Sequence, residues 1–330
     1  MRPSSISSNV DFDQDGVQHG FLKLPYSRDD SAWGAVMIPI AVVKGGEGPT
    51  ALLTGGNHGD EYEGPIALLK LASALRADEV HGRVIIVPAM NYPAFRAARR
   101  TSPADLRNMN RIFPGSPDGT VTEKIADYFQ RYLLPLADYV LDFHSGGKTL
   151  DFLPMAAVHV LPDKEQQARC VAAMEAFGAP YSATLLEMDS AGMYDSAAEE
   201  MGKVFVSTEL GGGGTSSARS VRITDRGVRS FLVHAGILEG ELEPRPTVRL
   251  DMPSAECFVT SESEGVVEMH KDLGEVVEAG EPVAAVYPVH KTGLAPMTYR
   301  AKIPGILMAR HFPGLIQTGD CLAVVAVRLD

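Results

Sequence analysis

The sequence predicts an α/β fold, in which helices cover both faces of a mostly parallel sheet, followed by a small all-β domain. Three observations predict it. Strand patterns alternate with helical patterns through the first two thirds of the 330 residues, a proline-rich segment follows at residues 242–246, and only short strand patterns come after it. We therefore expect a larger domain over residues 1–243 and a smaller one over residues 244–330.

In the larger domain, strands are predicted where apolar and β-branched residues run together between turn residues. These strands are residues 21–24, 36–43, 50–54, 83–88, 138–143, 156–161 and 203–208. Helices are predicted from apolar residues at helical spacing and from two capping patterns, Thr120-x-x-Glu123 and Asp163-x-x-Gln166. They are residues 62–75, 120–134, 163–177 and 224–237. Strands that alternate with helices are joined by crossovers and run parallel.

The smaller domain shows no helical pattern. Its strands are predicted at residues 256–260, 265–270, 282–289, 298–303, 306–311 and 321–327. A sequence segment that begins with Gly-Val-Val-Glu at residue 265 is weakly similar to a second segment that begins with Gly-Ile-Leu-Met at residue 305. The repeat resembles the β-hammerhead, or small barrel, of biotinyl and lipoyl carrier domains, in which a hairpin lysine is modified. Lys291 lies near that point without the flanking pattern, which favours a borrowed scaffold.

Composition excludes several classes of protein. With 45% hydrophobic and 22% charged residues the chain is an ordinary globular one. Its 30 basic and 42 acidic residues give a net charge of −12, which disfavours nucleic acid and anionic membranes as partners. Three distant cysteines, no signal-like apolar segment and no run of about 20 apolar residues lead us to expect a cytoplasmic protein.

The most informative motif is Thr-Gly-Gly-Asn-His-Gly-Asp-Glu-Tyr-Glu-Gly-Pro at residues 54–65. It places His58 three residues before Glu61, directly after a predicted strand, where ligands of open α/β folds bind. A histidine nitrogen and a carboxylate oxygen are two of the three protein ligands in a His₂Glu zinc site. Because the chain has nine histidines, this spacing also arises by chance and does not identify a site alone.

His144 supplies a third ligand in a matching context. It follows the predicted strand 138–143 and precedes Ser-Gly-Gly, just as His58 lies beside a Gly-Gly pair. Two histidines at strand ends indicate one shared crevice, although a hydrogen-bonded structural role for His144 stays open. Asp142, two residues earlier, is placed to orient one of the ligands.

Glu209 ends another apolar strand and precedes four glycines, residues 211–214. A carboxylate beside a metal site is suited to general base catalysis, because it takes a proton from the attacking water and returns it to the departing amine. A solvated or capping carboxylate fits the local pattern equally well. No Gly-Lys-Ser/Thr follows the glycines, which excludes a P-loop and favours a close backbone approach to substrate or simply a permissive loop.

A polar loop carries Asn-Met-Asn-Arg-Ile-Phe-Pro-Gly at residues 108–115. The planar guanidinium of Arg111 suits a carboxylate, and Asn110 adds a second donor. An ordinary surface arginine fits as well, because four further arginines crowd residues 96–107.

Together these motifs resemble those of the succinylglutamate desuccinylase/aspartoacylase family, a branch of the zinc carboxypeptidase fold, over residues 36–240. The extended forms of residues 58–65 and 108–115 most resemble the members that deacetylate Nα-acetyl-L-2,4-diaminobutyrate during ectoine breakdown. The resemblance implies a zinc-carboxypeptidase-like sheet with one Zn²⁺ per chain. It implies zinc ligands His58, Glu61 and His144, general base Glu209, and a pair, Asn110 and Arg111, for the substrate carboxylate.

The resemblance implies a zinc-dependent amidohydrolase that releases acetate from a small Nα-acetyl amino acid. A homo-oligomer is compatible with this interpretation. The side-chain ammonium of diaminobutyrate would need an acidic pocket, for which Asp105 and Glu187 are candidates. Three alternatives stay open. One is deacylation of another N-acyl amino acid, as by aspartoacylase or succinylglutamate desuccinylase. The others are a peptide carboxypeptidase and a non-catalytic carrier or binding protein working through Lys291.

One departure from the family pattern affects the scissile carbonyl. Aspartoacylases place an arginine that polarises this carbonyl eight residues before the Asn-Arg arginine, and here that position is Pro103. Candidates to replace it are Arg99, Arg100 and Arg107, and the missing arginine disfavours an acidic acyl group such as succinyl. The aromatic residue that the family contributes from its β domain has two candidates, Tyr287 and Tyr299.

Overall fold

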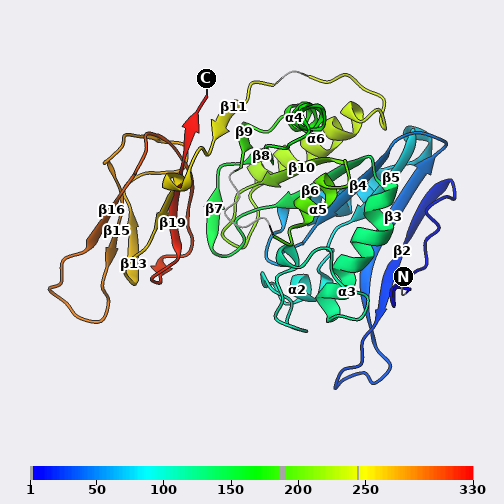
Figure 1. Cartoon of the computed structure of the whole chain (residues 1–330), viewed down its shortest axis with the longest axis horizontal. Coiled ribbons are helices and arrows are strands. Elements are labelled where there is room, and N and C mark those ends of the chain that lie inside the picture. Colours follow the sequence, from blue (N-terminus) through cyan, green and yellow to red (C-terminus); the bar gives the residue numbers. More distant parts are fainter. Residues whose placement is uncertain (1–2, 186–190, 244, 330) are drawn as a thin grey trace.

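The computed structural model describes residues 3–185, 191–243 and 245–329. A fifteen-stranded sheet runs through the molecule, and a separate four-stranded sheet lies at its C-terminal end (Figure 1). The strands up to the C-terminal region are β1 (Ser7–Ser8), β2 (Gly16–Pro25), β3 (Ala35–Gly45), β4 (Thr50–Gly55), β5 (Gly82–Val87), β6 (Tyr139–His144), β7 (Leu150–Phe152), β8 (Met155–Val158), β9 (Tyr181–Thr184), β10 (Val204–Glu209) and β11 (Val248–Asp251).

The helices of the larger part are α1 (Glu63–Ala74), α2 (Tyr92–Arg96), α3 (Val121–Tyr128), α4 (Lys164–Phe177), α5 (Tyr194–Glu199) and α6 (Ala218–His234). Both predicted caps are present. Thr120 and Glu123 form a capping box at the start of α3, and the Asp163 side chain accepts hydrogen bonds from two backbone amides at the start of α4. Shorter turns are η1 (Ala77–Glu79), η2 (Met109–Arg111), η3 (Phe129–Leu133) and η4 (Leu134–Leu136).

The centre of the large sheet is parallel, but the sheet as a whole is mixed. Strands β5, β4, β6 and β10 lie side by side in this order and are parallel. Strand β3 is antiparallel to β5, and β8 is antiparallel to β10, so the prediction of a mostly parallel sheet holds for the centre and for β8, β9 and β11, which are parallel to one another. The physical reason at one flank is the short turn of residues 46–49 between β3 and β4. It reverses the chain, so β3 runs opposite to β4 and therefore opposite to β5, which is parallel to β4.

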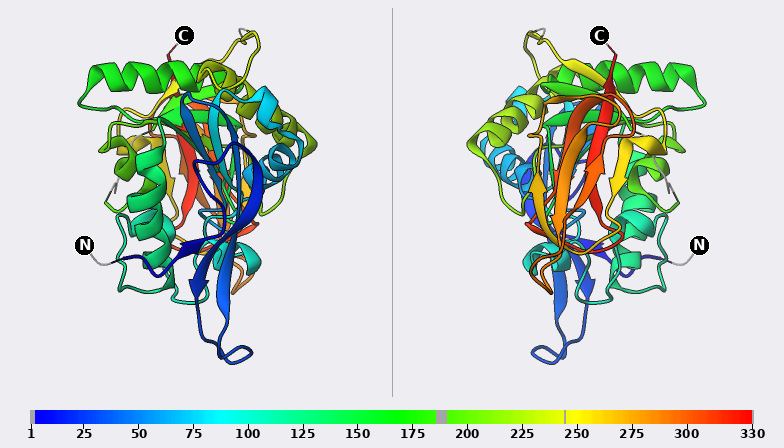
Figure 2. Two further views of the ribbon diagram at one scale, coloured as in Figure 1. Left: turned by 90° about the vertical axis from the view of Figure 1, so that its right-hand side faces the viewer. Right: turned by 90° about the vertical axis from the view of Figure 1, so that its left-hand side faces the viewer.

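Helices cover both faces of this sheet, as predicted. One apolar core lies between the sheet and α1, α4 and α6, and includes the fully buried Phe177 and Phe231. The other lies under α3 and α5, and includes Phe129 and Tyr194. Figure 2 shows α3 on one side of the sheet and α1 with α6 on the other. Each fully buried aromatic or aliphatic side chain contributes roughly 1.5–3 kcal/mol to folding.

The sequence patterns missed the shortest elements. Helices α2 and α5 have five and six residues, and β7 and β9 have three and four. Such segments are too short for an apolar repeat to stand out from the surrounding loops. The helix predicted over residues 120–134 is α-helical only to Tyr128 and then continues as the wider π turn η3 and the tighter 3₁₀ turn η4.

The C-terminal region is built of strands. They are β12 (Phe258–Thr260), β13 (Gly265–Met269), β14 (Val276–Val277), β15 (Pro282–Tyr287), β16 (Met297–Arg300), β17 (Gly305–His311), β18 (Leu315–Ile316) and β19 (Cys321–Arg328). The described part of this region has one helical element, the 3₁₀ turn η5 (Ala255–Cys257). Strands β13, β15, β16 and β18 form the four-stranded sheet, which with β17 and β19 surrounds an apolar core.

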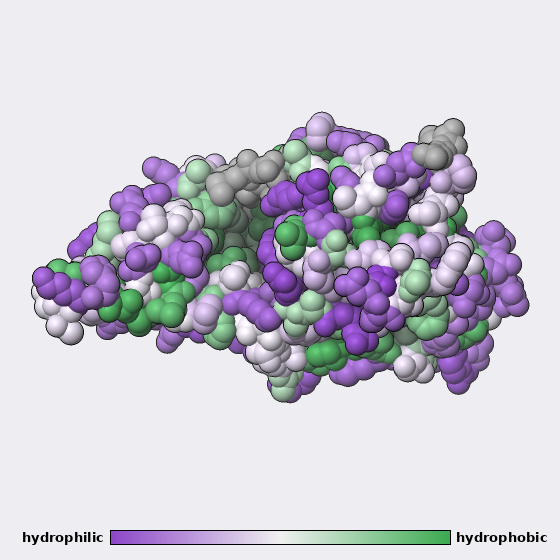
Figure 3. All heavy atoms as spheres, turned by 90° about the horizontal axis from the view of Figure 1, so that it is seen from below, coloured by the Kyte–Doolittle hydropathy of each residue, from purple (hydrophilic) through white to green (hydrophobic). Residues whose placement is uncertain are grey.

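The C-terminal strands are joined to the larger part by backbone hydrogen bonds. Strand β11 pairs with both β9 and β19, and β7, which follows His144 in the chain, pairs with β17. Seen from below, the surface is hollowed between the C-terminal strands on the left and the larger body on the right (Figure 3). Among the described residues no helix combines the length and the apolar character that crossing a membrane would require.

Candidate active site

Three parallel strands bring the candidate residues to one edge of the sheet. Strand β4 ends at Gly55, three residues before His58, while β6 ends at His144 and β10 at Glu209. Gly55 is in register with Phe143, and Glu209 is in register with His144. Since carboxyl ends of parallel strands meet at the same edge, this is where an open α/β fold binds its ligand.

His58, Glu61 and His144 converge as predicted. One potential ligand atom from each lies within 4.8 Å of the other two. Nδ1 of His58 is 2.7 Å from Oε1 of Glu61, and Nδ1 of His144 is 3.0 Å from Oε2 of the same carboxylate. Gly64 allows this approach, because a Cβ there would lie 2.1 Å from the Cβ of Phe143. The first turn of α1 therefore packs directly on β6.

The outer nitrogen of each imidazole bonds to a side-chain oxygen. Nε2 of His144 is 2.8 Å from Oδ2 of Asp142, which confirms that this aspartate is placed to orient the ring. Nε2 of His58 is 3.2 Å from Oδ1 of Asn108, a residue that the sequence patterns did not single out. Asp142 is itself held by Thr54, whose hydroxyl donates to Oδ1 at 2.6 Å. Such outer partners fix the tautomer and the orientation of metal-binding histidines.

The buried charges of the site influence one another strongly. Burial works against ionisation of Glu61, but the two imidazoles hold its pKa far below the usual range. Burial also opposes protonation of His144, yet the carboxylates of Asp142 and Glu61 raise its pKa well above the ordinary value. Burial lowers the pKa of His58, and the neighbouring Arg100 acts in the same direction. These shifts follow from the close packing of two carboxylates, Glu61 and Asp142, against two imidazoles.

The donor set fits a metal ion. The amide oxygen of Asn108 can only accept, so neutral His58 carries its proton on Nε2 and turns the lone pair of Nδ1 towards Glu61. Two acceptors 2.7 Å apart are stabilised by a cation close to both. Two imidazole nitrogens and one carboxylate are the protein ligands of a catalytic His₂Glu zinc site.

Glu209 stands beside His144 on the adjacent strand and is partly buried. Its side chain lies on the same face of the sheet as that of His144, because partners in parallel register share a face. The glycines that follow are needed for close backbone packing, since a Cβ on Gly212 would lie 1.9 Å from the carbonyl oxygen of Leu150. A Cβ on Gly213 would lie 3.1 Å from the ring of Phe312.

Phe312 is thus an aromatic side chain of the C-terminal region that lies against the loop after Glu209. The sequence patterns did not identify it. The two tyrosines that they offered bond elsewhere: the hydroxyl of Tyr287 donates to Glu268, and that of Tyr299 bonds to Ser261, Ser263 and the backbone amide of Glu262.

Asn110 and Arg111 lie in η2, next to the site through Asn108. The side-chain oxygen of Asn110 is buried and accepts hydrogen bonds from the backbone amide of Tyr194 at 2.9 Å and from the side-chain amide of Asn57 at 3.4 Å, so the amide nitrogen is the group that can donate to a ligand. Arg111 is exposed, and one guanidinium nitrogen donates to the carbonyl oxygen of Asn110 at 2.6 Å. Its described polar contact is with the backbone and not with the His-Glu-His group.

Of the three arginines considered as replacements at Pro103, the structure brings Arg100 to the site. Its guanidinium is 3.3 Å from Nδ1 of His58 and 3.7 Å from Oε1 of Glu61. Its side chain is 47% exposed, so it borders the site rather than being enclosed in it.

Neither of the two residues considered for an ammonium pocket is found beside the His-Glu-His group among the described residues. Asp105 accepts hydrogen bonds from the backbone amide and the hydroxyl of Thr122 at the start of α3. Glu187 lies outside the described residues.

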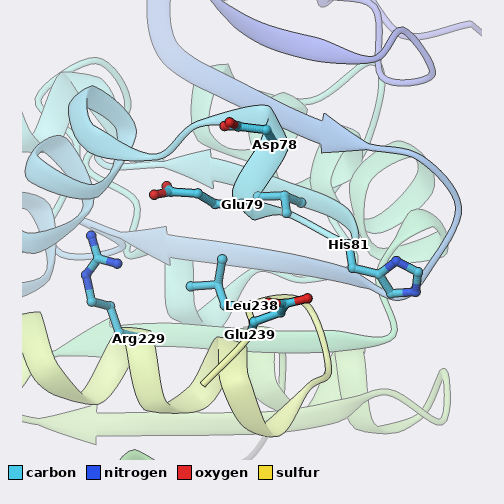
Figure 4. Close-up of a pocket in the computed structure, with 7 residues that line it drawn as sticks. Asp78, Glu79, His81, Arg229, Leu238 and Glu239 are labelled. Atoms are coloured by element: carbon cyan, nitrogen blue, oxygen red, sulfur yellow. The ribbon is translucent and has the colours of Figure 1, made fainter. Parts of the chain in front are cut away.

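A polar depression of about 460 Å³ lies at the opposite edge of the parallel strands (Figure 4). Its charged residues do not converge on one point, since His81 points away from Arg229 and Glu79. Asp78 is already paired with Arg76. The depression is therefore a solvated surface and does not compete with the His-Glu-His group as a catalytic centre.

Comparison with known proteins agrees with this geometry. The family model described as the succinylglutamate desuccinylase/aspartoacylase catalytic domain matches residues 47–235. The chain is 60% identical to the N-alpha-acetyl-L-2,4-diaminobutyric acid deacetylase of Halomonas elongata, over 99% of this chain and 96% of that relative.

Solved structures of similar proteins cover nearly the whole chain. The product-bound ectoine utilization protein EutE (DoeB) of Ruegeria pomeroyi is 64% identical, with a TM-score of 0.98 over 99% of this chain and 100% of that one. A succinylglutamate desuccinylase from Silicibacter sp. TM1040 is 62% identical, with a TM-score of 0.97 over 99% and 100% of the two chains. The chain therefore belongs to the succinylglutamate desuccinylase/aspartoacylase family.

Proposed function

We propose that the protein is a zinc-dependent amidohydrolase that removes the acetyl group from Nα-acetyl-L-2,4-diaminobutyrate, giving acetate and the free amino acid. The observation that carries the proposal is the convergence of His58, Glu61 and His144 within 4.8 Å at the carboxyl edge of the sheet. Family membership and 60% identity to a deacetylase of that substrate support the reaction.

In this proposal Nδ1 of His58, Nδ1 of His144 and the carboxylate of Glu61 hold one Zn²⁺ per chain. A bound Zn²⁺ supplies a Lewis acid that polarises the amide carbonyl and lets water attack near neutral pH. Glu209 takes the proton of the attacking water and later delivers it to the nitrogen of the departing amine. The positions of Glu209 and His144, in register on adjacent strands, support this role.

Substrate is anchored by the loop before α3. The guanidinium of Arg111 and the amide nitrogen of Asn110 bind the α-carboxylate, which holds the acetyl carbonyl in line for attack. We also propose that residues 1–243 form the catalytic domain and residues 244–330 a second domain. Through Phe312 and the pairing of β7 with β17, this second domain supports the loop after Glu209.

Arg100 takes the place of the arginine that is absent at position 103 and donates to the carbonyl oxygen as negative charge develops there. We expect Arg100→Ala to lower kcat about 100-fold, the lower end of the range for one such donor, because its side chain is half exposed. Steady-state kinetics with the zinc-loaded variant measure this. Arg99→Ala, which removes the neighbouring exposed arginine, is the matched control. Equal rates for the two variants would show that Arg100 does not act on the carbonyl.

Acetate release tests the function itself. We expect the zinc-loaded protein to release acetate from Nα-acetyl-L-2,4-diaminobutyrate, a chelated sample to release none, and added Zn²⁺ to restore activity. Nα-acetyl-L-aspartate and N-succinyl-L-glutamate, assayed beside it, test the alternative acyl and amino-acid specificities. Faster hydrolysis of either would leave the hydrolase in place and overturn the substrate. Chelator-resistant hydrolysis would overturn the metal.

A further inference from the structure

The loop between β6 and β7 carries Lys148, whose backbone is held at the active site. Its amide donates to Oδ2 of Asp60 at 2.9 Å. Asp60 is only 5% exposed, and it lies in the chain between two members of the His-Glu-His group, His58 and Glu61. The site therefore fixes the point from which the side chain of Lys148 starts, although that side chain is itself exposed.

The ammonium group of Lys148 binds a different segment, the turn that follows α2. Nζ donates to the carbonyl oxygen of Ala98 at 2.5 Å, across fifty positions of sequence. The aliphatic stem of the same side chain lies over Gly214, where a Cβ would be 2.7 Å from Cγ of Lys148. Together with the bond to Asp60, one lysine thus joins the segments that follow β4, β5 and β10.

Ala98 has a backbone conformation that an alanine rarely adopts. It ends the turn after α2 in the left-handed region, with a φ of +49°. Its amide donates to the carbonyl of Phe95 at 3.0 Å, and the amide of Arg99 donates to that of Ala94 at 3.1 Å. This is the pattern of a Schellman cap, whose left-handed position is usually a glycine because glycine lacks a Cβ. An alanine is strained there, so the bond from the Lys148 ammonium stabilises a turn that alanine alone disfavours.

The same turn sets the position of Arg100. The carbonyl of Arg99 accepts a hydrogen bond from the amide of Gly59 at 2.9 Å, directly after His58. The guanidinium of Arg100 lies 3.3 Å from Nδ1 of His58. Because this side chain is 47% exposed and has many rotamers, its direction depends on the backbone from which it starts. The bonds to Ala98 and Arg99 fix that backbone.

We propose that Lys148 is a positioning residue for catalysis: its ammonium holds the left-handed turn at Ala98 and so directs Arg100 towards the carbonyl oxygen of the substrate. The inference rests on the proposed function, in which Arg100 donates to that oxygen. Lys148 does not contact the substrate in this role, because it acts through the backbone of residues 98–100. Its positive charge suits the role, since a charge-assisted hydrogen bond is roughly twice as strong as a neutral one.

Lys148→Met tests the proposal, because it removes the ammonium and keeps an aliphatic stem over Gly214. In the zinc-loaded protein we expect kcat for Nα-acetyl-L-2,4-diaminobutyrate to fall about 10-fold, since a misplaced catalytic group costs up to about 100-fold. KM and zinc content should stay unchanged, because Asn110, Arg111 and the metal ligands keep their places. Lys148→Arg, which retains a cationic donor, should keep most of the rate.

Two double variants separate the positioning of Arg100 from a general loss of structure. With Arg100→Ala already present, Lys148→Met should cause no further loss, because no guanidinium is left to direct. Ala98→Gly should restore most of the rate to Lys148→Met, since glycine adopts the left-handed conformation without strain. Lys164→Met is the matched control: it removes a lysine that donates to the carbonyl of Leu161 at 2.7 Å, and it should leave the rate unchanged.

Amide hydrogen exchange tests the turn without relying on activity. The amides of Ala98 and Arg99 are hydrogen-bonded within the turn, so in Lys148→Met they should exchange about 5-fold faster, the effect of one lost hydrogen bond. Unchanged kcat or unchanged exchange in Lys148→Met would overturn the proposal, as would a loss of rate that Ala98→Gly does not restore. A wild-type protein that releases no acetate would instead overturn the proposed function, and faster exchange in the variant would still show that Lys148 holds the turn.

Discussion

Zinc content and acetate release should both be lost in His144→Ala, the largest effect that we expect from a single substitution. The change removes one of two imidazole ligands from a buried group whose remaining members are His58 and Glu61. With one imidazole and one carboxylate left, the site no longer has the three protein ligands typical of catalytic zinc. Metal analysis of the dialysed variant, beside kinetics, measures the loss.

Two further variants make the result specific. Asp142→Asn keeps the His144 ring but removes the carboxylate 2.8 Å from its Nε2, so zinc should bind about 10- to 100-fold more weakly without being lost. His81→Ala, an exposed histidine at the opposite edge of the sheet, should retain zinc and rate. Full zinc retention by His144→Ala would show that the third ligand is another residue.

The sequence predicts these ligands because their positions are set locally. His144 follows the apolar run of β6 without a break, and His58 and Glu61 lie within six residues of the end of β4. When neighbouring strands are parallel, their carboxyl ends lie at the same edge of the sheet, so side chains that follow those ends are brought together and can bind one metal ion. The central strands and the longer helices are predictable for the same reason, since each carries its own apolar pattern.

The site residues that could not be predicted from the sequence are those whose positions depend on tertiary contacts. Asn108 reaches His58 across fifty positions of sequence, and Phe312 reaches Gly213 from the C-terminal strands. Arg100 was one of three equivalent arginines until the backbone placed it beside His58. The antiparallel pairs of the sheet were missed, because an apolar pattern identifies a strand but does not say which other strand it pairs with or in which direction.

Glu209 is the residue whose replacement should separate catalysis from metal binding. We expect Glu209→Gln to lower kcat by about 10²- to 10⁴-fold, because the amide cannot take a proton from water and general acid–base catalysis supplies roughly that factor. Zinc content should stay unchanged, since the ligands lie on β6 and on the segment after β4, not on β10. KM should change little, because Glu209 holds no part of the anchored α-carboxylate in this mechanism.

The choice of glutamine keeps the size of the side chain, so packing next to His144 and Leu210 is preserved and a loss of rate reports the lost proton acceptor. Glu79→Gln, an exposed glutamate at the opposite edge, controls for the change in net charge. Rate, KM and zinc content should be measured on the same preparation of each variant. A full rate in Glu209→Gln would remove this residue from the chemistry, whereas loss of zinc together with rate would make it a ligand instead of a base.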